Sequence, residues 1–189
     1  MHFDGLFTLK GDGAGVVLTS PISDILRYVV QLYFQTTNNT TEYEGLLSGM
    51  RASSILGIKR LLAIGDSLLV VNQVQKKFQC SDLTIVAYLT EVRRLERRFI
   101  GFEVKPIRRE DNFLANEMAR LASSRKPILV GVFKERLSRP STTVLGQSEG
   151  DVLLRNGAPE PTPLEATPPS MPSTSDGHHV VALLDSGMT

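Results

Sequence analysis

A change in hydrophobic period after the third apolar run constrains the fold more than any other feature of this chain. Residues 2–8, 14–19 and 26–34 are short apolar runs typical of β-strands. The turn signal Gly11-Asp12-Gly13 separates the first two runs and favours a hairpin. Beyond the third run, apolar residues recur with helical spacing, beginning with Tyr43, Leu46, Leu47 and Met50. We therefore expect three consecutive strands, followed by a region that contains helices.

That region alternates helical and strand-like patterns. Residues 60–64 and 102–108 are predicted strands, and Gly57 is a predicted stop for the first helix. Further helices are predicted over about 67–77, 85–99 and 112–123. The predicted order is β-β-β-α-β-α-α-β-α. This order favours an α/β fold with a mixed sheet and helices on its faces.

Composition divides the chain near residue 143. All 12 Phe and Tyr residues precede position 134, and six of the ten prolines follow position 158. We expect a domain over residues 1–125, a connector over 126–146 and a low-complexity, disordered tail over 147–189, because the tail lacks the apolar content to offset the entropy of ordering.

Several classes of protein are disfavoured by composition. A single cysteine, Cys80, excludes an internal disulfide framework. No apolar run approaches the ~20 residues that a membrane span requires, and the N-terminus lacks a signal-peptide pattern. We expect an intracellular monomer, in the cytoplasm or nucleus, without a membrane partner.

The net charge of +1 conceals an uneven distribution. Residues 1–143 carry 20 Lys and Arg against 14 Asp and Glu, whereas residues 144–189 carry one basic and six acidic residues. The net charges of the two parts are +6 and −5. The basic part favours a polyanionic partner such as nucleic acid.

Four polar residues lie at positions from which their side chains can meet. Asp4 and Asp66 each end a short apolar run, and Glu42 and Asn116 lie in the first turns of predicted helices. A carboxylate cluster repels itself unless its members are protonated or a cation binds them. We therefore expect Mg²⁺ here, with Mn²⁺ as a substitute. Phosphodiester hydrolysis commonly uses two such ions roughly 3.5–4 Å apart, and Asp4 would bridge them.

Each of these residues also has a structural interpretation. Asn39 and Glu42 have the spacing of a helix-capping box, in which the glutamate serves only the helix start. Asp66-Ser67 and Asp111-Asn112 are equally plausible helix caps. Taken singly, each residue favours the structural interpretation; taken together and in this order, they favour a metal site.

Six motifs support the metal site as a set. They are FDG at 3–5, GAGVVL at 13–18, TNNTTEYEGLLSG at 37–49, GDSLLVVNQV at 65–74, EVRRLE at 91–96 and RREDNFLANEMARLASS at 108–124. With these motifs, residues 3–125 resemble a type 1 ribonuclease H domain, most similar to the version in plant long-terminal-repeat retrotransposon polyproteins.

The resemblance implies a ribonuclease H-like fold with a five-stranded mixed sheet, three antiparallel strands and then two parallel ones. It also implies two Mg²⁺ ions and cleavage of the RNA strand of an RNA–DNA hybrid, with Asp4, Glu42, Asp66 and Asn116 as metal ligands. Asn38 and Asn39 would contact the hybrid, where 2′-hydroxyls mark the RNA strand. Arg108 and Arg109 would bind phosphate, although exposed arginines are often merely solvated. A reverse transcriptase domain would accompany this one in a longer polyprotein.

Four departures from the family pattern support a second hypothesis. Asn116 stands where the family has its fourth aspartate, Leu68 where it usually has Gln, and Leu6 where a small residue is usual. We also expect a first strand shorter than the family's. The alternative is a catalytically impaired relic that keeps the fold and binds nucleic acid weakly. Residues 180–189 additionally resemble the Asp-Ser-Gly turn of retroviral-type proteases, as a remnant without a working site.

Overall fold

The structure is a computed structural model that describes residues 1–128 and 130–142. The predicted tail and the protease-like segment at 180–189 lie outside these residues. No helix in the described part of the chain combines the length and the apolar character needed to cross a membrane.

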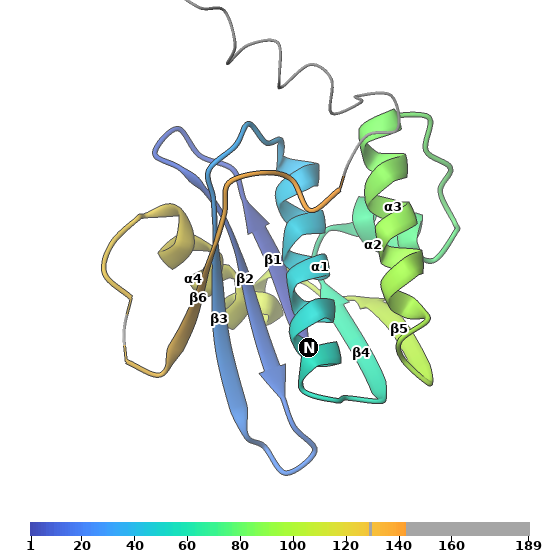
Figure 1. The fold of residues 1–189 in the computed structure, drawn as a ribbon, viewed down its shortest axis with the longest axis horizontal. Coiled ribbons are helices and arrows are strands. Elements are labelled where there is room, and N and C mark those ends of the chain that lie inside the picture. The colour runs from blue at the N-terminus through green and yellow to red at the C-terminus, as the bar shows by residue number, and fades with distance from the viewer. Residues whose placement is uncertain (129, 143–189) are drawn as a thin grey trace, which may run out of the picture. The chain divides into compact units, whose positions relative to one another are not determined.

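The centre of the domain is a mixed sheet (Figure 1). Its first three strands are β1 (His2–Leu6), β2 (Asp12–Thr19) and β3 (Ile25–Leu32). Strand β2 pairs antiparallel with both β1 and β3. Strand β4 (Arg60–Gly65) lies parallel to β1, and β5 (Gly101–Pro106) lies parallel to β4. The expected three antiparallel and two parallel strands are confirmed, and Asp4 lies on β1 in the interior of the sheet.

A sixth strand was not predicted. Strand β6 (Val132–Leu137) pairs in parallel with β3, so the sheet order is β5-β4-β1-β2-β3-β6. The prediction of five strands is therefore wrong. The sequence VFKERL carries a weak strand signal, because three of its six side chains are charged and none is fully buried. It forms a strand because the edge of β3 offers unpaired backbone groups.

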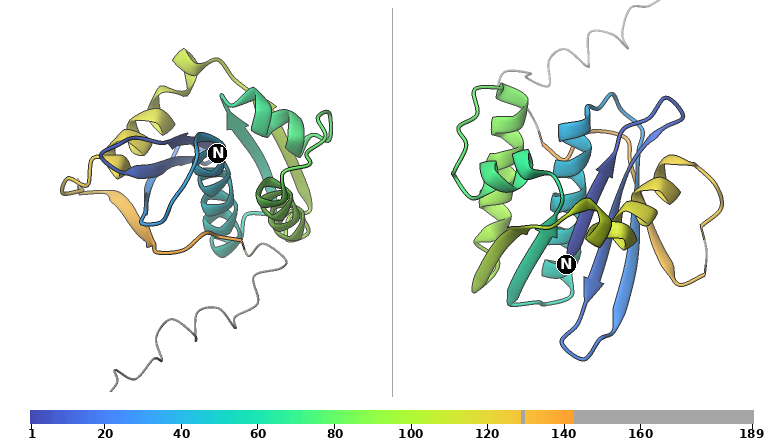
Figure 2. Two further views of the ribbon diagram at one scale, coloured as in Figure 1. Left: turned by 90° about the horizontal axis from the view of Figure 1, so that it is seen from above. Right: turned by 180° about the vertical axis from the view of Figure 1, so that it is seen from behind.

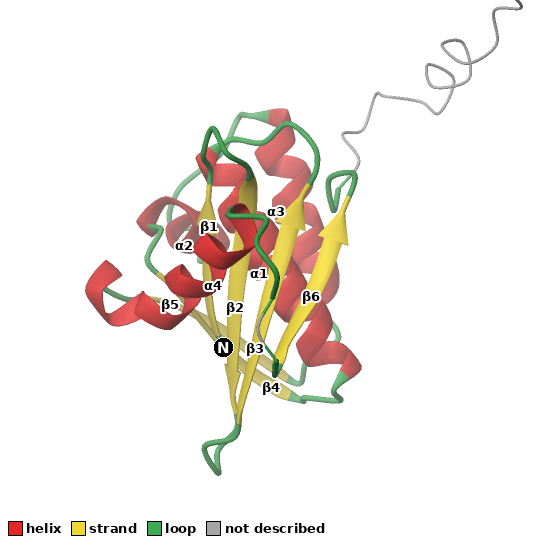
Figure 3. Cartoon of the chain, turned by 90° about the vertical axis from the view of Figure 1, so that its left-hand side faces the viewer, coloured by secondary structure: helices red, strands yellow, loops and turns green. Residues whose placement is uncertain are grey.

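Helices cover both faces of the sheet. Helices α1 (Asn38–Ile55) and α3 (Leu83–Glu96) lie on one face, and α4 (Phe113–Ser123) lies on the other (Figure 2). The short helix α2 (Leu68–Val74) follows β4, and a 3₁₀ turn, η1 (Arg109–Asn112), leads into α4. Figure 3 shows the same layers from the side, with the strands between the helices.

Side chains alternate between two core regions along β2. Val16 and Leu18 pack in the main cluster with α1 and α3, whereas Val17 packs with Val29 and Met118 under α4. This alternation is the period-2 pattern that a strand buried on both faces requires. Burial on both faces fixes the register of β2 and with it the position of β1, which carries Asp4.

The start of α1 is capped by two threonines. Thr37 is the N-cap, and its side chain accepts a hydrogen bond from the backbone N–H of Thr40, whose hydroxyl group accepts one from the N–H of Thr37. The alternative interpretation of Asn39 and Glu42 as a capping box is therefore wrong. Glu42 is consequently free for another role. At the other end, Gly57 adopts a left-handed conformation (φ 73°) just beyond the helix, as expected for a stop.

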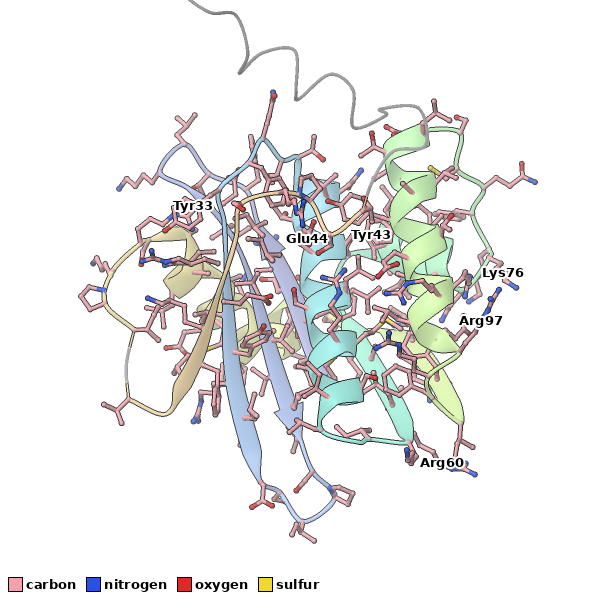
Figure 4. All side chains as sticks on the ribbon, viewed as in Figure 1. Tyr33, Tyr43, Glu44, Arg60, Lys76 and Arg97 are labelled. Atoms are coloured by element: carbon pink, nitrogen blue, oxygen red, sulfur yellow. The ribbon has the colours of Figure 1, made fainter. Side chains whose placement is uncertain are left out.

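The chain leaving β6 crosses α1 toward α3 and is hydrogen-bonded there (Figure 4). The carboxylate of Glu44, which is fully buried on α1, accepts hydrogen bonds from Tyr88 Oη (2.7 Å) and from the backbone N–H of Ser141 (2.8 Å). Arg51 donates to the hydroxyl and carbonyl oxygens of Ser141. Residues 138–142 thus cover a buried carboxylate that would otherwise have one partner among the described residues.

Candidate metal centre

Three carboxylates from distant parts of the sequence meet at one end of the sheet. Asp4 lies in the middle of β1, Glu42 in the second turn of α1, and Asp66 directly after β4. One carboxylate oxygen from each lies within 4.8 Å of the others. Asp4 and Glu42 are only 2% and 5% exposed, whereas Asp66 is half-buried.

Two glycines allow the helices to approach the strands closely enough to assemble this site. A Cβ atom on Gly5 would lie 2.3 Å from the backbone nitrogen of Glu42, and one on Gly15 would lie 2.2 Å from the carbonyl oxygen of Ala115. Neither position tolerates a side chain, so α1 packs directly on β1 and α4 directly on β2. This contact brings Glu42 and Asn116 to Asp4.

Asn116 contacts the cluster through its amide nitrogen. Its Nδ2 donates a hydrogen bond of 2.8 Å to Asp4 Oδ2, and the side chain is 8% exposed. An aspartate at this position would instead add a fourth negative charge. In the structure the amide therefore stabilises the ionised form of Asp4 and does not repel it.

Electrostatics at the cluster favour a bound cation. Burial, followed by the nearby Asp66 carboxylate, raises the pKa of Asp4 to about 6, although Asn116 and Arg109 act in the opposite direction. Burial, followed by the charges of Asp4 and Asp66, raises the pKa of Glu42 well above its usual value, despite a 3.1 Å hydrogen bond from Gly5 N–H. No ion pair in the described residues involves these three carboxylates.

The donor set fits a hard divalent cation. Carboxylate oxygens are the ligands that Mg²⁺ and Mn²⁺ prefer. A cation would offset the cost of burying these charges, which is the largest cause of the two raised pKa values, and also their mutual repulsion. No lysine or arginine forms an ion pair with these three carboxylates in the described part of the chain. The residues present are therefore compatible with the expected metal.

A residue that sequence reasoning considered only as a possible helix cap contributes to the site. Asn112 is 1% exposed and stands at the N-cap position of α4, but its side chain makes no capping hydrogen bond. Its Nδ2 donates to Asp66 Oδ1 (3.0 Å) and to the carbonyl oxygen of Phe3 (2.9 Å), and its Oδ1 lies 3.2 Å from His2 Nδ1. The cap of α2 is Ser67, which accepts a hydrogen bond from the N–H of Val70, so Asp66 serves no cap either. The position of Asn112 before the last predicted helix gives no signal that distinguishes a helix cap from a residue that contacts the site.

The predicted nucleic-acid-binding residues lie at two places. Asn38 and Asn39 form the first turn of α1, at the same end of the helix as Glu42, and are exposed and half-buried respectively. Arg108 is exposed and pairs with Glu110 and Asp111. Arg109 forms no ion pair among the described residues, and its charge lowers the pKa of Asp4. Arg109 is therefore the arginine whose charge acts on the site.

The surface beside Asn116 is hollowed. An open pocket there is lined by Arg109, Glu110, Phe113, Asn116, Glu117 and Arg120. Leu68, two positions after Asp66, begins α2 and is 61% exposed. Its aliphatic side chain offers no hydrogen bond to a polar ligand.

Comparisons with known proteins relate this arrangement to a family. A family model described as reverse transcriptase-like matches residues 2–122. The bifunctional protein Rv2228c of Mycobacterium tuberculosis is 28% identical over 109 residues, which are 58% of this chain and 30% of that protein. The chain thus spans less than a third of the length of the curated relatives it matches.

Solved structures of similar proteins share the fold. RNase H1 from the halophilic archaeon Halobacterium salinarum NRC-1 superposes with a TM-score of 0.61 at 25% identity, covering 64% of this chain and 93% of that chain. LC11-RNase H1, crystallised in complex with RNA/DNA hybrid, superposes with a TM-score of 0.60 at 23% identity, covering 66% and 95%. The sheet with its two helical layers is therefore a ribonuclease H-like fold.

Proposed function

The chain belongs to the reverse transcriptase-like family, and we propose that it is a metal-dependent endonuclease that hydrolyses the RNA strand of RNA–DNA hybrids. The observation that carries the proposal is the group of three carboxylates within 4.8 Å of one another, without an ion-pair partner among the described residues. A protein maintains such a group against its own repulsion when a cation is used there. The proposal includes an origin in a plant-type retrotransposon polyprotein that also carries a reverse transcriptase, and action inside the cell as a monomer.

The residues of the site would divide the work as follows. Asp4, Glu42 and Asp66 would hold the ions, and Asn116 would be a weak, uncharged fourth ligand. When bound, Mg²⁺ or Mn²⁺ would stabilise negative charge on the phosphate and lower the pKa of an attacking water. The Gly5 N–H orients the Glu42 carboxylate by its 3.1 Å hydrogen bond, so this ligand is positioned before any ion arrives.

The surroundings of the site would position the hybrid. Asn38 and Asn39 lie in the first turn of α1, just before Glu42, and their amides would reach the minor groove and its 2′-hydroxyls. Arg109 would bind a phosphate beside the site, because its guanidinium group has no competing carboxylate partner among the described residues. Arg108 would contribute less, since Glu110 and Asp111 already neutralise it.

The proposal is tested by cleavage of an end-labelled RNA–DNA hybrid by the full chain, first with Mg²⁺ and then with Mn²⁺. We expect metal-dependent cutting of the RNA strand, leaving the DNA strand intact, and loss of that cutting in Asp66→Asn. Duplex DNA of the same sequence is the substrate control. A folded protein that cuts no RNA strand with either ion would refute the nuclease proposal.

A second candidate function rests on Asn116 and Leu68. The amide of Asn116 donates to Asp4 where the family has a carboxylate, and Leu68 exposes an aliphatic group two positions after Asp66. Both favour a domain that binds nucleic acid weakly without cutting it. Retention of the hybrid in a gel-shift measurement, together with no cleavage by either the natural chain or Asn116→Asp, would support this function.

Replacement of Asn116 by aspartate should strengthen metal binding. The new carboxylate adds a charged oxygen ligand, so we expect half-maximal cleavage at about tenfold lower Mg²⁺ concentration. Without metal, the same variant should melt at a lower temperature, because a donor to Asp4 becomes a fourth negative charge. Gln79→Glu adds the same charge at an exposed loop position and should change neither quantity. An unchanged Mg²⁺ dependence would show that position 116 is not a ligand.

A further inference from the structure

We propose that Asn112 is a positioning residue that holds the Asp66 carboxylate in place for metal binding, and that His2 fixes the orientation of Asn112. This inference rests on the proposed function, because it concerns the same carboxylates. Asn112 lies at the end of η1, and its contacts join β1, the end of β4 and the start of α4. The side chain is 1% exposed, so these contacts exclude water from the back of the Asp66 carboxylate.

The partners of Asn112 define which end of its amide points where. Phe3 contributes a carbonyl oxygen and Asp66 a carboxylate oxygen, and both accept hydrogen bonds only. The NH₂ group must therefore face these two atoms, and its two hydrogens serve one acceptor each. Oδ1 is then left as an acceptor, 3.2 Å from His2 Nδ1. His2 consequently carries its proton on Nδ1 and donates to Asn112.

This arrangement leaves Asp66 with one oxygen held and one available. Oδ1 of Asp66 accepts from Asn112, while the described residues provide no hydrogen bond to the other oxygen. A ligand whose carboxylate is already oriented loses less conformational freedom on binding an ion. Asp66 is the half-buried member of the cluster, and its carboxylate receives no other hydrogen bond from the described residues, so it depends most on such support.

The three contacts of Asn112, with His2, Phe3 and Asp66, are not contacts between neighbours in the sequence. Asn112 is separated from Asp66 by 46 positions and from His2 by 110 positions. Its amide does not cap α4, whose start receives no side-chain cap hydrogen bond. The contact to Phe3 holds η1 against β1, and the contact to Asp66 is the one that acts on the metal ligand.

The test is the affinity of the full chain for Mn²⁺ alone, measured by isothermal titration calorimetry without nucleic acid. We expect Asn112→Ala to weaken Mn²⁺ binding by about 10-fold or more, the range found for groups that hold metal ligands. In an Asp66→Asn background the same change should have no further effect, because the residue acts through Asp66. Gln73→Ala removes a buried amide that bonds Tyr43 on α1 and should leave the affinity unchanged.

Two variants of His2 test the proposal even if Asn112→Ala does not fold. His2→Asn retains a side-chain donor close to the place of Nδ1 and should bind Mn²⁺ as the natural chain does. His2→Leu has similar bulk and no donor, so it should weaken binding several-fold. The melting temperature without metal should be similar in the two variants, because His2 is half-buried at the edge of the core.

Two results would overturn the inference. One is natural Mn²⁺ affinity in folded Asn112→Ala; if that variant does not fold, equal affinities of His2→Leu and His2→Asn are decisive. The other is an equal loss of affinity with and without Asp66, which would show a general structural role. Because ion binding is measured without a hybrid, a chain that binds Mn²⁺ in this way and cuts no RNA would refute only the nuclease function.

Discussion

Asp4→Asn should abolish cleavage and, in the absence of metal, make the protein more stable. The substitution removes the charge at the centre of the carboxylate group, so we expect a loss of activity of more than about 100-fold, beyond the usual effect of groups that only support a ligand. The gain in stability has a separate cause. An amide at position 4 still accepts the hydrogen bond from Asn116 and is not repelled by Asp66 and Glu42.

The direction of the pH effect follows from the raised pKa of Asp4. Its value of about 6 in the folded chain lies above the ordinary 3.8, so the folded chain binds more protons than the unfolded chain between these values. The stability contributed by this carboxyl group is fully present below about pH 4 and is lost as the pH rises through about 6. Glu42, whose pKa is also raised, acts in the same direction.

The measurement is thermal or urea unfolding of the metal-free natural chain and of Asp4→Asn between about pH 4 and 7. We expect the two proteins to have similar free energies of unfolding at about pH 4. At neutral pH, the free energy of unfolding of the variant should be higher by on the order of 2 kcal/mol. Saturating Mg²⁺ should reverse that order, because only the natural chain gains binding energy. Asp24→Asn, in the exposed turn between β2 and β3, is the matched control. A variant less stable than the natural chain at neutral pH without metal would contradict the repulsion argument.

Ending the chain at Arg125 should destabilise the domain strongly. A chain ending at Arg125 would lose the six residue pairs between β3 and β6 and expose the edge of β3, whose Val30 and Leu32 are almost completely buried. It would also lose the Ser141 N–H that Glu44 accepts, leaving a fully buried carboxylate with only Tyr88 as a partner among the described residues. One oxygen of Glu44 already has no partner there.

We expect this truncation to cost more than about 3 kcal/mol, since loss of a partner to a buried charged group alone costs 1–3 kcal/mol or more. The corresponding drop in melting temperature is about 10 °C or more. A chain ending at Thr142 retains β6 and the contacts of Ser141, and should have the same melting temperature as the full chain. Equal melting temperatures for the chains ending at 125 and 142 would show that β6 is not part of the folding unit.

The contribution of the hydrogen bond between Ser141 and Glu44 can be measured apart from that of strand β6. Ser141→Pro removes the backbone N–H that donates to Glu44 and also the hydroxyl group that accepts from Arg51, whereas Ser141→Ala removes the hydroxyl group alone. A Ser141→Pro chain that is less stable than Ser141→Ala would locate part of the cost at the buried carboxylate. Glu44→Gln in the same chain should reduce the cost, because an amide is less expensive than a charge to bury with an incomplete set of hydrogen bonds.

Much of the fold follows from local patterns in the sequence. The helices and the first five strands begin and end within a few residues of their predicted bounds, because hydrophobic period and stop signals such as Gly57 act over short distances. Strand β6 could not be predicted in this way. Its charged residues carry little strand preference, and it exists because β3 presents an open edge, which is a property of the assembled sheet.

Some features of the site likewise follow from local sequence patterns, and others do not. The acidic side chains at strand ends and helix starts follow from the sequence pattern, which predicts that Asp4, Glu42 and Asp66 can meet. The orientation of the Asn116 amide toward Asp4 and the hydrogen bond from Asn112 to Asp66 follow from the folded structure alone. Both depend on hydrogen-bond partners that lie between 46 and 112 positions away along the chain. The hydrophobic pattern of a segment reflects which face it buries, whereas the direction of a single amide depends on the donors and acceptors that folding brings within 3 Å of it.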